Sequence, residues 1–146
     1  MTRPIWVQEP TPYELNLRCQ NSLSDHLGIE FTSFTSISLS ARMRIDQRTI
    51  QPMEIMHGGA SAALAETVGS AAGNYCIHSD LYYCVGIELN INHLKAAKEG
   101  WVHATATPLH LGKQTQVWEI KIQDDNGTLI SAARLTLMVL EKKKGR

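Results

Sequence analysis

The chain has 146 residues, near the commonest size of a single domain, so it can bury one core and has no room for a second domain. Hydrophobic residues make up 43% and charged residues 19%, which is ordinary globular usage and argues against disorder and fibrous repeats. Fourteen basic residues balance fourteen acidic ones, which argues against a nucleic-acid partner because non-specific binding of that kind needs a strongly positive field.

The cysteine spacing and the N-terminal sequence both bear on the cellular compartment. Cys19, Cys76 and Cys84 are odd in number and have neither CxxC spacing nor a nearby set of histidines, so we expect reduced thiols, no disulfide framework and no metal site. The N-terminus has no long apolar run typical of a signal peptide, and no stretch of about eighteen apolar residues occurs anywhere. These features predict a cytoplasmic protein without a membrane partner.

Residues 1–27 are predicted to form a helical N-terminal segment. In Thr11-Pro12-Tyr13-Glu14 the threonine fits an N-cap, the proline fits the first helical position and the glutamate completes a capping box, so a helix should run to about Gln20. Residues 22–28 are typical of a helical turn closed by Gly28. We therefore expect two short helical elements before the first strand.

The middle of the chain predicts a strand, a loop and a buried helix in that order. Apolar residues alternate with mostly polar ones over residues 37–45, which is typical of a half-buried strand. Residues 46–56 contain Pro52 and have no period, so we expect a loop over the site into which they lead. Residues 58–74 are rich in alanine and apolar on nearly every face, which predicts a buried helix closely wrapped by a sheet.

The rest of the chain is dominated by segments with a period of two. Four strands in sequence, predicted to form an antiparallel meander, cover residues 83–94, 101–111, 115–124 and 129–140. Gly100 separates the first two, and Asp125-Asn126-Gly127 is a strong hairpin-turn sequence. Residues 141–146 are interpreted as a solvated basic tail.

This order of elements, with one or two strands before the long helix and four after it, predicts the α+β class. We expect one long central helix packed on an antiparallel sheet in a single domain over residues 1–146. A single helix layer leaves the far face of the sheet uncovered, and the sheet must also have edge strands. Both features favour a homodimer or a homotetramer.

Glu66 is the only ionisable side chain between Ala60 and Gly73, in the middle of this predicted core helix. The residues one turn away from it are all small: Ala62, Ala63, Gly69 and Ser70. There is room beside the carboxylate for a ligand or water, and partial desolvation would raise its pKa, which suits a general base or a nucleophile. The alternative is a glutamate that faces solvent or belongs to a structural network.

His57-Gly58-Gly59 stands where the loop becomes the helix, so the amides of Gly58 and Gly59 should be among the unpaired donors of the first turn. They form a potential oxyanion hole for a carbonyl oxygen, unless the two glycines merely permit a tight turn. Glu66 is two turns further on, about 11 to 12 Å along the axis at 1.5 Å per residue. Either water bridges this gap or two subunits assemble the site.

Seven motifs together resemble those of one known family. They are Gln51-Pro52, Met56-His57-Gly58-Gly59-Ala60-Ser61, Leu64-Ala65-Glu66, Gly69-Ser70, Val85-Gly86-Ile87-Glu88-Leu89-Asn90, Asn92-His93 and Pro108-Leu109-His110-Leu111-Gly112-Lys113. In this pattern, which covers nearly the whole chain, the sequence resembles the hotdog-fold acyl-CoA thioesterases. It is most similar to the phenylacetate-pathway type branch, which includes the enterobactin proofreading and 1,4-dihydroxy-2-naphthoyl-CoA thioesterases.

The resemblance implies a sheet wrapped around the helix, active sites at a dimer interface, and usually a tetramer. It implies that Glu66 of one subunit acts as general base or nucleophile. Gln51, His57 and the Gly58 amide of the other subunit would polarise the thioester carbonyl. Ser70 would hold water or the acyl ring, although by itself it could bond back to the Glu66 backbone carbonyl.

The resemblance also implies contacts with the substrate and its coenzyme A arm. Besides Ala71, which is small and suggests a roomy acyl pocket, the residues concerned are Gly86, His93, Leu94, Lys95, Ala96, His110, Leu111, Gly112, Lys113 and Gln114. Judged alone, His93 shares strand parity with Val85 and Ile91 and would be an inward histidine with a satisfied hydrogen bond. Lys113 alone could be an ordinary solvated lysine. Met53-Glu54 departs from the family pattern, which leaves the substrate contacts of that loop open.

The predicted function is hydrolysis of an aromatic or medium-chain acyl-CoA to the free acid and coenzyme A, without a metal or an organic cofactor. Two functions on the same architecture remain as alternatives. One is an acyl-CoA binding module without turnover, and the other is a dehydratase or hydratase that uses a histidine with an acidic residue. The third alternative is a purely structural oligomer.

Overall fold

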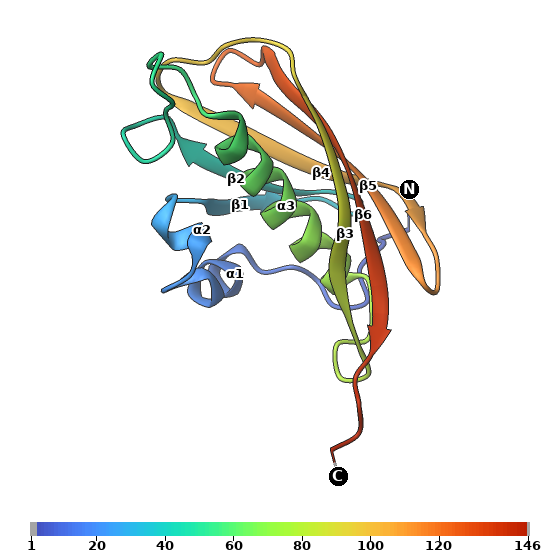
Figure 1. The fold of residues 1–146 in the computed structure, drawn as a ribbon. Coiled ribbons are helices and arrows are strands. Elements are labelled where there is room, and N and C mark those ends of the chain that lie inside the picture. Colours follow the sequence, from blue (N-terminus) through green and yellow to red (C-terminus); the bar gives the residue numbers. More distant parts are fainter. Residues whose placement is uncertain (1–2, 146) are drawn as a thin grey trace.

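The computed structural model describes residues 3–145, so Met1, Thr2 and Arg146 of the predicted terminal segments lie outside the described residues. A six-stranded antiparallel sheet curves around one long helix, as the predicted α+β class requires (Figure 1). In chain order the elements are α1 (Pro12–Cys19), α2 (Leu23–His26), β1 (Glu30–Phe34), β2 (Leu39–Arg44), α3 (Gly58–Tyr75), β3 (Tyr82–His93), β4 (Trp101–Leu111), β5 (Thr115–Asp124) and β6 (Leu129–Glu141).

The strand order in the sheet is β1-β2-β4-β5-β6-β3. The predicted meander is correct for β4, β5 and β6, but wrong for β3, which pairs with β6 at the edge instead of with β4. β4 pairs instead with β2, which comes before α3 in the chain. Alternation along a strand shows which face is buried, but it carries no information on which strand lies alongside, so this partner exchange was not visible in the sequence.

Two N-terminal predictions need correction. Thr11 is the N-cap of α1 and Pro12 begins the helix as predicted, but the Thr11 side chain makes no cap hydrogen bond, so the capping box is absent. The predicted strand over residues 37–45 begins only at Leu39, because the Thr35 hydroxyl oxygen accepts hydrogen bonds from the amides of Ile37 and Ser38 and forms a turn there. The second strand allowed before the long helix is β1, whose bounds were not predicted because it has no alternation, with only Phe31 buried.

Helix α3 lies directly on β5 and β6 because its contact residues are glycine and alanine. Gly69 and Gly73 are both buried, and a Cβ atom at Gly69 would come within 2.6 Å of Leu135 Cδ2. The Gly73 carbonyl accepts a hydrogen bond from the buried Gln116 Nε2 at 3.3 Å, and Gln116 Oε1 accepts one from Trp118 Nε1 at 2.9 Å. The prediction of a closely wrapped helix is therefore confirmed. None of the described helices is long and apolar enough to cross a membrane.

Replacing Gly73 by alanine should destabilise the protein even though alanine is the better helix former. A Cβ atom there would overlap Leu137 Cδ1 and lie 2.6 Å from Gln116 Oε1. We expect overpacking to cost about 1–3 kcal/mol, which outweighs a helix-propensity gain of about 1 kcal/mol. Thermal unfolding measures the effect, with Gly145→Ala as the control because a Cβ atom there meets open space. An unchanged or higher Tm for Gly73→Ala would contradict this packing.

Candidate active site

A pocket of about 340 Å³ opens at the start of α3, and we call it the helix-start pocket. Its lining includes Gln51, Gly58, Ser61, His93 and Ser131. Three further residues predicted to bind substrate, Leu94, Lys95 and Ala96, also line it. The loop before α3, the first turn of α3, the end of β3 and the start of β6 therefore meet at one place, although they are far apart in the sequence.

The first turn of α3 leaves one amide free for a ligand. The Gly59 amide donates to Nδ1 of His57 at 2.7 Å, and the amides of Ala60 and Ser61 donate to the His57 carbonyl oxygen. The predicted pair of donors is therefore reduced to one, because Gly59 is already occupied by the helix cap. Among residues 3–145 the Gly58 amide has no hydrogen-bond acceptor, and it lies at the positive end of the helix dipole. This is a donor available to an oxyanion.

His57 is the N-cap residue of α3, and its side chain is exposed. Because its Nδ1 accepts the hydrogen bond of Gly59, the neutral imidazole carries its proton on Nε2. The ring does not line the helix-start pocket. Its observed contact is thus structural, and it leaves only Nε2–H for a substrate.

Gln51 is held by the loop that departs from the family pattern. Its Oε1 accepts a hydrogen bond from the Met53 amide at 2.6 Å, which leaves the side-chain NH₂ as a donor toward the pocket. Glu54 has a positive φ of 62°, and the Met53 side chain is 78% exposed. Met53-Glu54 therefore positions Gln51 through the backbone of the turn, and not through its own side chains.

Glu66 lies half-buried at the middle of α3, where its carboxylate rests against the backbone of Gly86 on β3. Burial raises the pKa of Glu66, and a long hydrogen bond from Ser70 Oγ at 3.5 Å opposes the rise. Ser70 thus faces the carboxylate, whereas Thr67 bonds back to the Ala63 carbonyl at 2.7 Å. A carboxylate with a raised pKa is suited to take a proton from water near neutral pH.

A bulge in β3 brings Gly86 beneath Glu66. The register with β6 shifts between Gly86 and Glu88, which reverses the faces on which the following residues lie. His93 points to the inner face as predicted, because it pairs with Ser131, but it does not share that face with Val85. The predicted parity along the whole strand is therefore wrong.

Within one chain the predicted site residues fall into three separate groups. Gly58 and Glu66 are eight residues apart on α3, so about 12 Å separates them along the axis. The turn containing Gly112 and Lys113 borders a different cavity of about 400 Å³, which Cys76 lines at the other end of α3. A single protomer does not bring the free amide, the carboxylate and this hairpin together.

Comparison with known proteins gives the family. The model of the thioesterase superfamily matches residues 53–131. The proofreading thioesterase EntH of Cronobacter turicensis is 44% identical over 136 residues, which cover 93% of this chain and 98% of that protein. The 1,4-dihydroxy-2-naphthoyl-CoA hydrolase of Escherichia coli (strain K12) is 41% identical over 136 residues, which cover 93% of this chain and 99% of that protein.

A crystal structure of a mutant of thioesterase PA1618 from Pseudomonas aeruginosa superimposes with a TM-score of 0.93 at 44% sequence identity. The match covers 94% of this chain and 99% of that one. The chain belongs to the thioesterase superfamily. The resemblance to the hotdog thioesterases, the hotdog fold class and the thioesterase activity are thereby confirmed.

Two polar pocket residues of this thioesterase were not predicted from the sequence. Ser61 and Ser131 are both buried, and both line the helix-start pocket. The signal for Ser131 was a polar residue at an inward position of β6, in phase with Ala133 and Leu135. Within residues 3–145 no group of three His, Cys, Asp or Glu side chains is placed to hold a metal ion.

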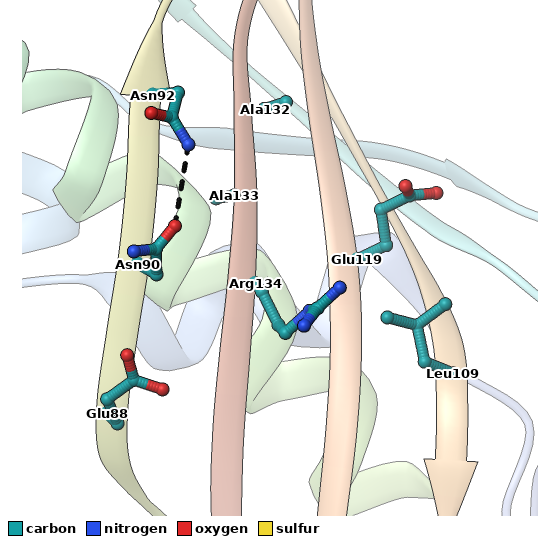
Figure 2. Close-up of a pocket in the computed structure, with 8 residues that line it drawn as sticks. All are labelled: Glu88, Asn90, Asn92, Leu109, Glu119, Ala132, Ala133 and Arg134. Carbon is teal, nitrogen blue, oxygen red and sulfur yellow. Dashed lines mark hydrogen bonds between the residues drawn. The ribbon is translucent and has the colours of Figure 1, made fainter.

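A third hollow, of about 430 Å³, lies on the face of the thioesterase sheet away from α3 (Figure 2). Glu88 and Glu119 flank Arg134 there, and Asn92 Nδ2 donates to Asn90 Oδ1 at 3.5 Å. None of the predicted site residues lines this hollow. The single chain thus leaves a polar surface that carries both signs of charge on the back of the sheet.

Proposed function

We propose that this thioesterase hydrolyses an aromatic or medium-chain acyl-CoA to the free acid and coenzyme A. The observation that carries the proposal is the free Gly58 amide at the start of α3, on the same helix as a half-buried carboxylate with a raised pKa. The names of two relatives support the acyl-CoA class, since one is a dihydroxynaphthoyl-CoA hydrolase and the other a proofreading thioesterase.

In the reaction, Glu66 takes a proton from water, and the water oxygen attacks the thioester carbonyl carbon. The Gly58 amide and the helix dipole stabilise the negative charge on the carbonyl oxygen, with Gln51 and Nε2–H of His57 as further donors. The C–S bond then breaks, coenzyme A leaves as the thiolate, and the proton on Glu66 passes to that sulfur or to solvent, which restores the carboxylate. Direct attack by Glu66, giving an anhydride that water opens, uses the same groups. Either route needs water alone, so we propose that the enzyme uses no cofactor.

We propose a homodimer formed through β3. The two edges of the sheet differ: β1 has five residues, and Asn16 of α1 caps it by accepting from the Phe31 amide and donating to the Phe31 carbonyl. β3 has twelve residues, and Asn74 caps it in the same way only at Cys84. From Gly86 to His93 its backbone has no partner on that side within the described chain. Long uncovered edge strands pair with another copy.

A two-fold axis across β3 would make the two α3 helices antiparallel, so Glu66 of one protomer could approach the Gly58 amide of the other. This removes the 12 Å separation within one chain. The residues from His110 to Gln114 would meet the coenzyme A arm beside His93, Leu94, Lys95 and Ala96, with Ala71 facing the acyl group. The uncovered back of the sheet supports a further pairing of dimers into a homotetramer, which we place in the cytoplasm.

Thiol release from a panel of aryl- and alkyl-CoA thioesters, followed with a thiol-reactive dye, tests this function. We expect wild-type turnover, and for Glu66→Ala a loss of about 10² to 10⁴-fold in kcat with the fold retained. Glu9→Ala, which removes an exposed glutamate, is the matched control and should keep full activity. Binding of the thioesters without thiol release would favour the binding module. Hydration of an enoyl-CoA without thiol release would favour the hydratase.

A further inference from the structure

The His93 ring lies between a buried hydroxyl group and the first residue of α3. Its Nδ1 lies 3.1 Å from Oγ of Ser131, which has no exposed surface. On the other side of the ring, Nε2 lies 2.7 Å from the position that a Cβ atom on Gly58 would take. The ring thus occupies the space that a side chain at Gly58 would fill, and only glycine permits this approach.

The direction of this contact places Nε2 beside the free amide. In a helix the Cα–Cβ bond tilts toward the N-terminus, and the amides of the first turn point the same way. A group that occupies the Cβ position of Gly58 therefore faces the space into which the Gly58 N–H points. Both groups line the helix-start pocket, and the described residues offer no acceptor for either.

The direction of the hydrogen bond between His93 Nδ1 and the Ser131 hydroxyl determines which ring nitrogen carries the proton. If the Ser131 Oγ–H donates to Nδ1, the neutral imidazole keeps its proton on Nε2, where it faces the pocket. If Nδ1–H donated to Ser131 instead, the hydroxyl proton of a fully buried serine would need another acceptor, and Nε2 would be an acceptor facing the unpaired Gly58 amide. Only the first arrangement leaves two donors that converge on one point.

We propose that His93 is a catalytic residue whose Nε2–H, together with the Gly58 N–H, donates a hydrogen bond to the thioester oxygen as it becomes an oxyanion, and that Ser131 is its positioning residue. This inference rests on the proposed thioesterase reaction and adds no proton transfer to it. The carbonyl π electrons move onto oxygen as water attacks, and they return when the C–S bond breaks. The two donors stay protonated throughout.

Two simpler roles for a histidine at this position predict different kinetics. A histidine that only contacts the coenzyme A arm contributes to KM for coenzyme A esters and nothing to esters that lack the arm. A histidine that only packs at the end of the sheet contributes to the stability of the fold. An oxyanion donor acts in the transition state, so its loss lowers kcat whatever the leaving group carries.

The test compares one acyl group on two thiols, coenzyme A and N-acetylcysteamine, which lacks the nucleotide arm. For His93→Ala we expect kcat to fall about 10²-fold on both esters with little change in KM, as for removal of one oxyanion donor. His93→Gln offers an amide NH₂ at a similar reach and should recover part of the loss on both. Ser131→Ala should lower kcat on both by a smaller factor, with the substrate KM unchanged.

Lys95→Ala is the contrasting control, because Lys95 is an exposed pocket residue with a charge suited to the phosphates of the arm. It should raise KM for the coenzyme A ester and leave the N-acetylcysteamine ester unaffected. A His93→Ala variant with that same pattern, or one with unchanged kcat, would overturn the inference, and His93→Gln supplies the decision if the alanine variant fails to fold. Wild-type protein that hydrolyses neither ester would refute the proposed function itself, and this inference with it.

Discussion

Two inactive variants, Glu66→Ala and Gly58→Val, should recover about a quarter of the wild-type thiol-release rate when they are co-expressed in equal amounts and pair at random in a two-fold dimer. Each variant alone lacks one half of every site. In a mixed dimer one site carries both substitutions, while the other combines the intact Glu66 of one chain with the intact Gly58 of its partner. Half of all dimers are mixed and each has one complete site.

The recovery depends on the two halves coming from different chains, as we propose from the eight-residue spacing on α3. Co-expressed Glu66→Ala and Glu66→Gln provide the matched control, since no pairing of these chains contains an intact carboxylate. That mixture should stay as inactive as either variant. If Glu66→Ala with Gly58→Val also stayed inactive while mixed dimers were present by mass spectrometry, one chain would have to supply the carboxylate and the amide to the same site.

Local signals in the sequence predicted most of the secondary structure. The alternation over β3 to β6 placed those strands to within a residue at each end, because each has one face on the core and one face toward solvent. The alanine-rich run gave α3 to within one residue of its end. The bounds of β1 were not predicted, because this short edge strand buries a single side chain. The position of β3 in the sheet was not predicted either, because long-range packing determines which strands pair.

The site was predicted less completely, and the misses have physical causes. The Gly58 and Gly59 amides look equivalent in the sequence, but the cap formed by His57 occupies one of them. Ser131 belongs to the pocket only because β6 runs past the end of β3, a contact that spans 38 residues of chain. Gly86 was assigned to the substrate path, and its close contact with Glu66 depends on a bulge that no local pattern indicates.

Gly86→Ala should lower kcat strongly while leaving thermal stability close to that of wild type. A Cβ atom at this position would overlap Glu66 Oε1, and the carboxylate end of a flexible side chain can move away more easily than the strand. Glu66 would turn toward solvent and would no longer be positioned to take a proton from the attacking water. A misplacement of about 1 Å in a catalytic group can cost about 10²-fold. Alanine is also the less costly residue inside a strand.

The pH profile separates this displacement from a loss of substrate binding. Burial raises the pKa of Glu66, so a carboxylate pushed toward water should titrate lower, and the acidic limb of the Gly86→Ala kcat profile should move to lower pH. Val85→Ala, on the opposite face of the same strand, should keep both kcat and this limb. A Gly86→Ala enzyme with normal kcat, an unmoved acidic limb and a raised KM would instead assign Gly86 to the substrate path, with no part in holding the carboxylate.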